Sequence, residues 1–301
     1  MTSSTATGLP ERLARFGWLE RRVRDLPRSI AFHVDGLGFR LLGGCAMTQG
    51  DPPGALLGLG DQRLVLRPVP SATAATAATA ATAGITVFAG PDVRFQHAAI
   101  VARDMDAALR RLLPLAPGPI TRGGPQRLPV ASGGVTAFKF RDPDGHPLEL
   151  LEFPADDVPA RWRGPAGAGP TLGIDHLALA VADVVRSVAF YERLGFRVAG
   201  RQLNTGAAQA RLDGLDAADG TQGEGDVAVD VVVLRLPRAP GPHLELLGYR
   251  RPAPVVVAAA PDREDGDDHA LADRAHWIGM PSTGAFADPD GHRHRWTEGA
   301  P

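Results

Sequence analysis

The chain has 301 residues, of which 44% are apolar and 22% charged, a composition typical of a soluble globular protein with one large or two ordinary domains. The formal net charge is −2 and Lys139 is the only lysine, so the chain lacks the basic excess that would follow a phosphate backbone, which argues against nucleic-acid binding. Cys45 is the only cysteine, which excludes an intrachain disulfide, and no apolar run is long enough for a membrane span or a signal peptide. We therefore expect a cytoplasmic protein without membrane contacts.

Three stretches of the chain repeat one pattern, in which a strand residue stands seven positions before an Asp that opens a helix. They are WLERRVRDLPRSIAFHVDGLGF from Trp18, HAAIVARDMDAALRRL from His97 and HLALAVADVVRSVAFYERLGF from His176. Each unit is too small to bury its own apolar face, so internal repetition predicts modules that pack against one another.

Two segments separate the repeats, and their composition argues against a packed core. Residues 71–84 are a low-complexity run of Ala and Thr, and residues 154–170 are rich in Pro and Gly. We interpret both as linkers, which leaves modules at residues 13–70, 85–153, 171–252 and 253–301. The first module is a degenerate copy of the repeat, and the fourth is too short to be a complete copy.

The third module shows the order of elements best. Apolar and small residues alternate from His176 to Val181, the period of a strand with two different faces. Asp183 is then a natural N-cap for a helix over 184–193, and Gly195 supplies its C-terminal stop. Further strands are expected over 196–200, 227–235 and 243–249. The module is therefore predicted as β-α-β-β-β.

A tight turn precedes the last strand of modules two and four. Both turns read Asp-Pro-Asp-Gly, at residues 142–145 and 288–291, and these residues favour a chain reversal into a final strand. His146 and His292 follow the turns directly, so we expect them at the surface rather than among metal ligands. Glu152, in the strand after the first turn, is expected to be solvated.

These residues resemble the vicinal oxygen chelate superfamily, which includes glyoxalase I, methylmalonyl-CoA epimerase, extradiol dioxygenases, and fosfomycin and bleomycin resistance proteins. The resemblance rests on the strand His, the Asp-capped helix followed by FYERLGF, and the DPDGHPLELLEF ending. It implies an α+β fold in which repeated βαβββ modules pair into two barrel-like domains. It also implies a divalent metal held by residues from the first and last strands of the modules.

The resemblance places the ligands unevenly along the chain. First-strand positions of modules one to three are Trp18, His97 and His176, and last-strand positions of modules one to four are Val65, Glu149, Glu245 and Arg295. Module one therefore offers no ligand. The best first-strand candidate in module four is His276, in ADRAHWIGM.

Two pairings of the modules remain open at this point. If modules two and three share one barrel, His97, Glu149, His176 and Glu245 form one site for Zn, Fe(II), Mn, Ni or Co. If module one pairs with two and three with four, the quartet is divided, and His176 and Glu245 join His276 instead. The loss of ligands from modules one and four together favours the first pairing.

The resemblance implies three functions for such a site. The first is a metal-dependent enzyme acting on a small substrate with vicinal oxygens by glyoxalase-like or epimerase-like proton abstraction, with Glu149 or Glu245 as the base. The second is an extradiol-type Fe(II) dioxygenase, and the third is a non-catalytic binding or resistance protein. Three residues of module three are candidate substrate contacts, namely Asn204, Gln209 and Tyr249. The sequence leaves open whether the barrel closes within one chain or across a homodimer.

Overall fold

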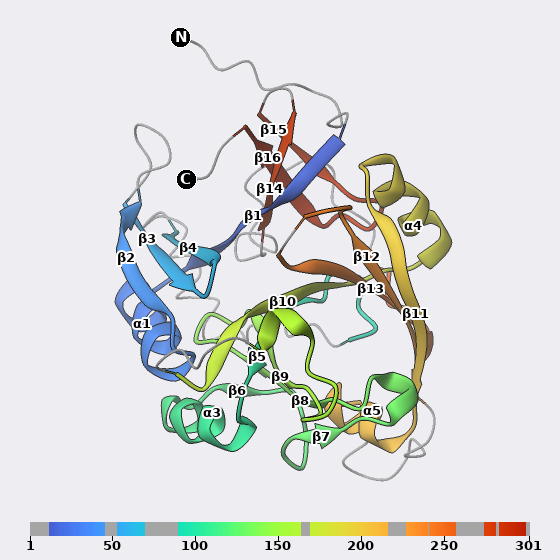
Figure 1. The fold of residues 1–301 in the computed structure, drawn as a ribbon, viewed down its shortest axis with the longest axis horizontal. Coiled ribbons are helices and arrows are strands. Elements are labelled where there is room, and N and C mark those ends of the chain that lie inside the picture. Colours follow the sequence, from blue (N-terminus) through green and yellow to red (C-terminus); the bar gives the residue numbers. More distant parts are fainter. Residues whose placement is uncertain are drawn as a thin grey trace.

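The computed structural model describes residues 12–45, 53–69, 90–163, 169–215, 227–239, 241–256, 274–280 and 283–298. These residues form two curved mixed sheets with short helices at their periphery (Figure 1). The α+β fold of paired βαβββ modules is confirmed, with open curved sheets in place of closed barrels. No helix of the described part is long and apolar enough to cross a membrane. The first predicted linker, 71–84, lies outside the described residues.

Modules two and three share a nine-stranded sheet. Its main path has the order β11-β12-β13-β10-β5-β9-β8-β6, and β7 pairs with β8 off this path. Module two supplies β5 (Gln96–Ala102), β6 (Gly118–Pro119), β7 (Gln126–Arg127), β8 (Thr136–Arg141) and β9 (Pro147–Glu152). Module three supplies β10 (Thr171–Ala180), β11 (Arg197–Thr205), β12 (Ala228–Arg235) and β13 (His243–Arg251).

Modules one and four share a seven-stranded sheet with the order β15-β16-β14-β1-β4-β3-β2. Module one supplies β1 (Arg12–Val23), β2 (Arg40–Cys45), β3 (Gly54–Leu59) and β4 (Gln62–Pro68). Module four supplies β14 (Arg274–Met280), β15 (Gly284–Ala287) and β16 (Arg293–Thr297). The structure thus has the first of the two pairings that the sequence left open.

One pairing rule organises both sheets. The first strand of each module lies parallel to the last strand of the same module, as β5 does to β9 and β10 does to β13. The first strands of two modules then pair antiparallel at the centre, β5 with β10 and β1 with β14. Four strands from two modules therefore meet at the middle of each sheet.

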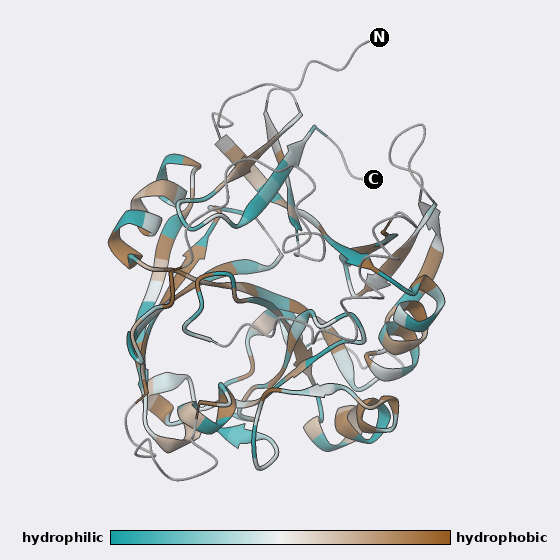
Figure 2. Ribbon diagram, turned by 180° about the vertical axis from the view of Figure 1, so that it is seen from behind, coloured by the Kyte–Doolittle hydropathy of each residue, from teal (hydrophilic) through white to brown (hydrophobic). Residues whose placement is uncertain are grey.

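The helices begin where the repeated Asp residues predict. Asp25, Asp104 and Asp183 each accept a hydrogen bond from the backbone N–H three residues later, at 3.0, 2.8 and 3.0 Å. These caps open α1 (Leu26–Ala31), α3 (Met105–Leu112) and α4 (Val184–Arg193); α5 (Ala207–Leu212) begins without a side-chain cap. The helices carry both hydrophobic and hydrophilic residues (Figure 2), and α3 and α4 bury one face against the sheets.

The two Asp-Pro-Asp-Gly turns dock on the helix of a neighbouring module. Asp144 accepts from the backbone N–H of Arg24 at 2.8 Å and from Ser29 Oγ at 2.7 Å, at the start of α1. Asp290 accepts from Ala182 N at 3.3 Å and Ser187 Oγ at 3.1 Å, at the start of α4. The second Asp of each turn therefore joins two modules whose central strands lie in different sheets.

Two positions predicted at the surface are buried, and a third is half-buried. His146 and His292 are only 4% and 5% exposed, and Nε2 of His146 bonds Arg22 O while Nδ1 of His292 bonds Asp288 Oδ2. Glu152 accepts from Met105 N at 3.0 Å, at the start of α3. The expectation of surface positions was wrong for His146 and His292, because a neighbouring module docks on each turn. Glu152 is held instead by the start of α3 in its own module.

The second predicted linker contributes to the core. Its described residues include a 3-10 turn, η4 (Ala160–Trp162), and the indole of Trp162 is buried. Trp162 Nε1 donates to Asp175 Oδ1 at 3.0 Å. The segment therefore packs against the start of β10, which its Pro and Gly content did not indicate.

Replacing Asp144 with Ala is expected to lower the free energy of unfolding by about 2–4 kcal/mol, because two donors and the Arg24 guanidinium lose their buried acceptor. Urea titration followed by circular dichroism measures the change. The control is Asp157→Ala, since Asp157 is exposed. Equal stability of the two variants would show that the turn does not hold the modules together.

Candidate metal centre

Three of the four predicted ligands converge at the centre of the nine-stranded sheet. His97 on β5, Glu149 on β9 and His176 on β10 each offer one ligand atom, and these three atoms lie within 4.8 Å of one another. His97 Nε2 is 2.8 Å from Glu149 Oε2. All three residues are buried. Two imidazoles and a carboxylate are a donor set that divalent transition metals favour.

The fourth predicted ligand, Glu245 on β13, lies at the edge of this group. Its Oε2 is 3.6 Å from His176 Nε2, while its Oε1 is 3.3 Å from His243 Nε2. The Glu245 side chain is 19% exposed, against 7% for that of Glu149. Glu245 therefore contacts the group from its more accessible side.

Strand register explains the convergence. In module two, Glu149 pairs with the residue two positions after His97, and in module three Glu245 pairs with the residue two positions after His176. Residues two apart on a strand share a face, so each His points to the same side as its module's Glu. The antiparallel pairing of β5 with β10 then brings the two His/Glu pairs together.

Charge and burial give the two imidazoles opposite protonation states. Burial, and then the neighbouring Lys139 cation, lower the pKa of His97, so this ring is neutral and has a lone pair to donate. Burial also lowers the pKa of His176, but Glu245 and Asp175 outweigh it and raise the pKa to about 9. A cation that bound His176 at neutral pH would therefore displace a proton.

Glu149 stays ionised despite its burial. Burial alone would raise its pKa, but Lys139, with Nζ 4.0 Å from Oε2, and then His97 hold the pKa at about 2. Burial likewise lowers the pKa of Lys139, but Asp213 and Glu149 outweigh it and raise the pKa, so the amine stays charged.

Sequence reasoning missed the buried Asp175. Its Oδ2 is 3.2 Å from His176 Nδ1 and 3.8 Å from His243 Nδ1, and its Oδ1 accepts from Trp162. Asp175, His176 and His243 also form a second group whose ligand atoms lie within 4.8 Å of one another. A carboxylate directly before a strand His was a usable signal, because a ligating His needs a partner for its other nitrogen.

The three candidate substrate contacts lie in one buried hydrogen-bond network. Asn204 Nδ2 donates to Gln209 Oε1 at 3.1 Å, and Gln209 Nε2 donates to Asp213 Oδ2 at 2.7 Å. Tyr249 Oη donates to the same Asp213 oxygen at 2.9 Å, and Lys139 Nζ donates to Oδ1 at 2.7 Å. The network leads through Lys139 to Glu149. Substrate contact by Asn204, Gln209 and Tyr249 stays a prediction.

Comparison with known proteins decides the family. The model of the Glyoxalase/Bleomycin resistance protein/Dioxygenase superfamily matches residues 15–150 and 173–295. The chain belongs to this superfamily. The resemblance seen in the sequence is thereby confirmed.

Solved structures agree with this assignment of the superfamily fold. A variant of glyoxalase I from Zea mays gives a TM-score of 0.58 at 17% identity and covers 94% of this chain and 92% of that chain. A "putative dioxygenase" from Bacillus subtilis gives a TM-score of 0.53 at 11% identity, covering 95% of this chain and 85% of that chain. At these identities the likeness establishes the fold alone. No curated protein matches the sequence.

The seven-stranded sheet of modules one and four lacks the two-His, two-Glu ligand set at its centre. Ala99, two positions after His97, pairs with Glu149 on one side and His176 on the other. Glu20, two positions after Trp18, pairs in the same way with Val65 and Arg274. The equivalents of the four ligand positions are therefore Trp18, Val65, Arg274 and Arg295. His276, predicted at the first-strand position, stands two residues too far along β14 and in the other sheet from His176. That prediction was wrong.

An ion cluster occupies the centre of this second sheet. Glu20 Oε2 is 3.1 Å from Arg67 Nε and 3.2 Å from His276 Nε2, and Oε1 is 3.8 Å from Arg274 Nη1. The Trp18 ring stacks on the His276 ring, with centroids 4.3 Å apart. Burial would raise the pKa of Glu20, but His276 and then Arg67 hold it at about 2. The cluster thus joins residues of modules one and four.

Glu20→Gln is expected to destabilise the protein by about 3 kcal/mol at pH 7, since a carboxyl whose pKa falls from 4.5 to about 2 on folding contributes that much. A lowered carboxyl pKa stabilises the fold above the unfolded pKa, so the gap between wild type and variant narrows as pH falls from 4.5 toward 2. Urea titrations at several pH values measure it. A gap independent of pH would contradict the assignment.

Proposed function

We propose that the chain is a metal-dependent enzyme that removes a carbon-bound proton from a small substrate with adjacent oxygens. The observation that supports this most is the approach of the ligand atoms of His97, Glu149 and His176 to within 4.8 Å of one another in a buried site. The superfamily match and the fold likeness to glyoxalase I support the same class of chemistry.

The donor set fits a divalent metal. One ring is neutral, one carboxylate is ionised, and the second ring can lose its proton to a cation. His97, Glu149 and His176 would hold the metal, and Glu245, with Oε2 3.6 Å from His176 Nε2, would stand beside it. The bound metal would act as a Lewis acid that polarises a substrate carbonyl and stabilises the enediolate.

Glu245 is the better base of the two glutamates. Glu149 is engaged by both His97 and Lys139, whereas Glu245 is more exposed and lies outside the tight group. In this proposal Oε2 of Glu245 takes the proton from the substrate carbon and returns it. His243, 3.3 Å from Oε1, orients the carboxylate.

Lys139 has a separate role in the proposal. Its ammonium keeps Glu149 ionised and able to bind a cation, and Asp213 fixes the ammonium by a 2.7 Å hydrogen bond. Lys139 lies opposite Glu149 on the neighbouring strand. The corresponding positions of the other three modules hold apolar residues, namely Val233 opposite Glu245, Leu56 opposite Val65 and Ala285 opposite Arg295. An amine is thus present only beside the module-two carboxylate.

A specific observation also favours an extradiol-type dioxygenase as a second candidate. The tight group is two His and one carboxylate, with Glu245 turned partly to His243, and such triads suit non-haem Fe(II). This function requires Fe(II) and oxygen uptake with a catechol. A protein that holds Zn, Ni, Co or Mn and consumes no oxygen would favour the first candidate.

Exchange in D₂O tests the first candidate without knowledge of the product. With a panel of 2-hydroxyacyl thioesters, proton NMR should show loss of the C2 proton signal as deuterium enters at the carbon beside the thioester carbonyl. Glu245→Gln should keep its metal and lose exchange by at least about 100-fold. Glu149→Gln should lose metal in elemental analysis, and exchange with it.

The matched control is Glu152→Gln, on the same strand as Glu149 but on its other face, which should keep both metal and exchange. Full exchange by Glu245→Gln would reject Glu245 as the base. Unchanged metal content in Glu149→Gln would reject the ligand set.

A further inference from the structure

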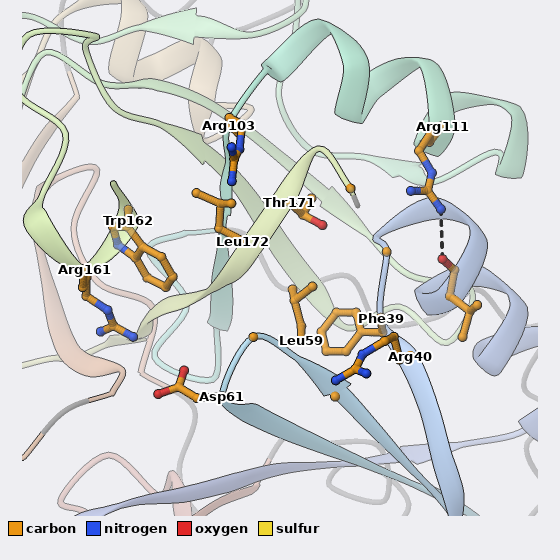
Figure 3. Close-up of a pocket in the computed structure, with 15 residues that line it drawn as sticks. Phe39, Arg40, Leu59, Asp61, Arg103, Arg111, Arg161, Trp162, Thr171 and Leu172 are labelled. Atoms are coloured by element: carbon orange, nitrogen blue, oxygen red, sulfur yellow. Dashed lines mark hydrogen bonds between the residues drawn. The ribbon is translucent and has the colours of Figure 1, made fainter. Parts of the chain in front are cut away.

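A second cleft, of about 550 Å³, lies between modules one, two and three (Figure 3). Its walls are the β3–β4 turn, the start of β10, the end of β5, α3 and η4. None of its lining residues belongs to the His/Glu group at the centre of the sheet. A volume of this size is usual for a small-molecule site.

The cleft is strongly basic. Among the residues that the structure describes, four arginines line it, Arg40, Arg103, Arg111 and Arg161, against the one carboxylate of Asp61. This excess of positive charge stands in a chain whose net charge is −2. Like charges in one cleft repel each other, so the arrangement favours a bound anion.

Two of the arginines are held in place by backbone carbonyls. Arg111 donates from Nε to Asp35 O at 2.9 Å and from Nη2 to Val34 O at 3.2 Å, the contact drawn in Figure 3. Arg161 donates from Nη1 to Gly241 O at 2.7 Å and stacks on Trp162 at 4.2 Å. Both guanidinium groups are therefore positioned before any ligand arrives.

The other two arginines are available to a ligand. Within the described ranges, the guanidinium groups of Arg40 and Arg103 form no hydrogen bond or ion pair, and both residues are exposed. In Figure 3 they approach the middle of the cleft from opposite sides. Guanidinium groups bind carboxylate and phosphate oxygens in pairs of hydrogen bonds.

The floor of the cleft is apolar. Phe39, Leu59 and Leu172 lie between the arginines in Figure 3, and Phe39 and Leu59 are buried. A bare inorganic ion would leave this apolar surface exposed to water. A ligand with an apolar body and an anionic head would cover the floor and pair with the rim.

We propose that this cleft is a binding site for a small amphipathic oxyanion, a carboxylate or phosphate on a short apolar body. The site is independent of the proposed catalytic function. It is nevertheless a near neighbour of the His/Glu group, because Trp162 in its wall bonds Asp175, which in turn contacts His176. The test must therefore distinguish the two sites.

Isothermal titration calorimetry with three ligands of one chain length tests the charge requirement. Hexyl phosphate and hexanoate should bind, and the tighter of the two identifies the head group, while hexan-1-ol should not bind measurably. Affinity for the anion should fall as salt rises, since the ion pairs lie near the surface. Equal binding of hexan-1-ol, or no binding of either anion, would overturn the proposal.

Variants locate the bound anion. The double variant Arg40→Gln with Arg103→Gln should weaken binding at least about ten-fold, because two charge-assisted contacts are lost. Arg201→Gln, at an exposed position on β11, is the matched control and should bind as wild type. Glu149→Gln should also leave binding unchanged. Loss of binding in Glu149→Gln alone would place the anion in the metal centre and reject the cleft.

Discussion

The antiparallel pairing of β5 with β10 is the constraint on which the rest of the structure depends. Because each first strand also lies parallel to the last strand of its own module, this single pairing makes four strands from two modules neighbours at the middle of the sheet. The His and Glu of each module are offset by the same two residues, so both pairs face one side. A shift of one residue in this register would turn a His to the opposite face.

The same frame carries different chemistry in the two sheets. In one, ligand-forming residues stand at the central positions and Lys139 balances the carboxylates. In the other, Trp18 and Arg274 stand at equivalent positions, and Glu20 neutralises the buried cations. Buried charges need partners, and in the sheet without the ligand set Glu20 pairs with the buried cations. The fold therefore supports one centre of each kind.

Much of the fold was predictable, because it depends on local signals. Asp25, Asp104 and Asp183 cap the helices that the repeats indicate, and alternation located the central strands. Residues whose partners are distant in sequence could not be placed. The contact of Lys139 with Asp213 spans 74 positions. His276 was assigned two residues out of register because no Asp stands seven positions later, the signal that aligned the other three modules. Likewise, burial of His146 depends on module one, which covers its turn.

The family model recognises two sequence units, 15–150 and 173–295, yet each unit divides its strands between both sheets. The chain is thus built like two interlocked subunits joined by a covalent connection. Its centre forms from modules two and three, which are neighbours along one polypeptide, so its assembly is an intramolecular event. Dilution separates the halves of a site that two subunits share, but it cannot separate residues of one chain. The described residues of each polypeptide supply one centre of this composition.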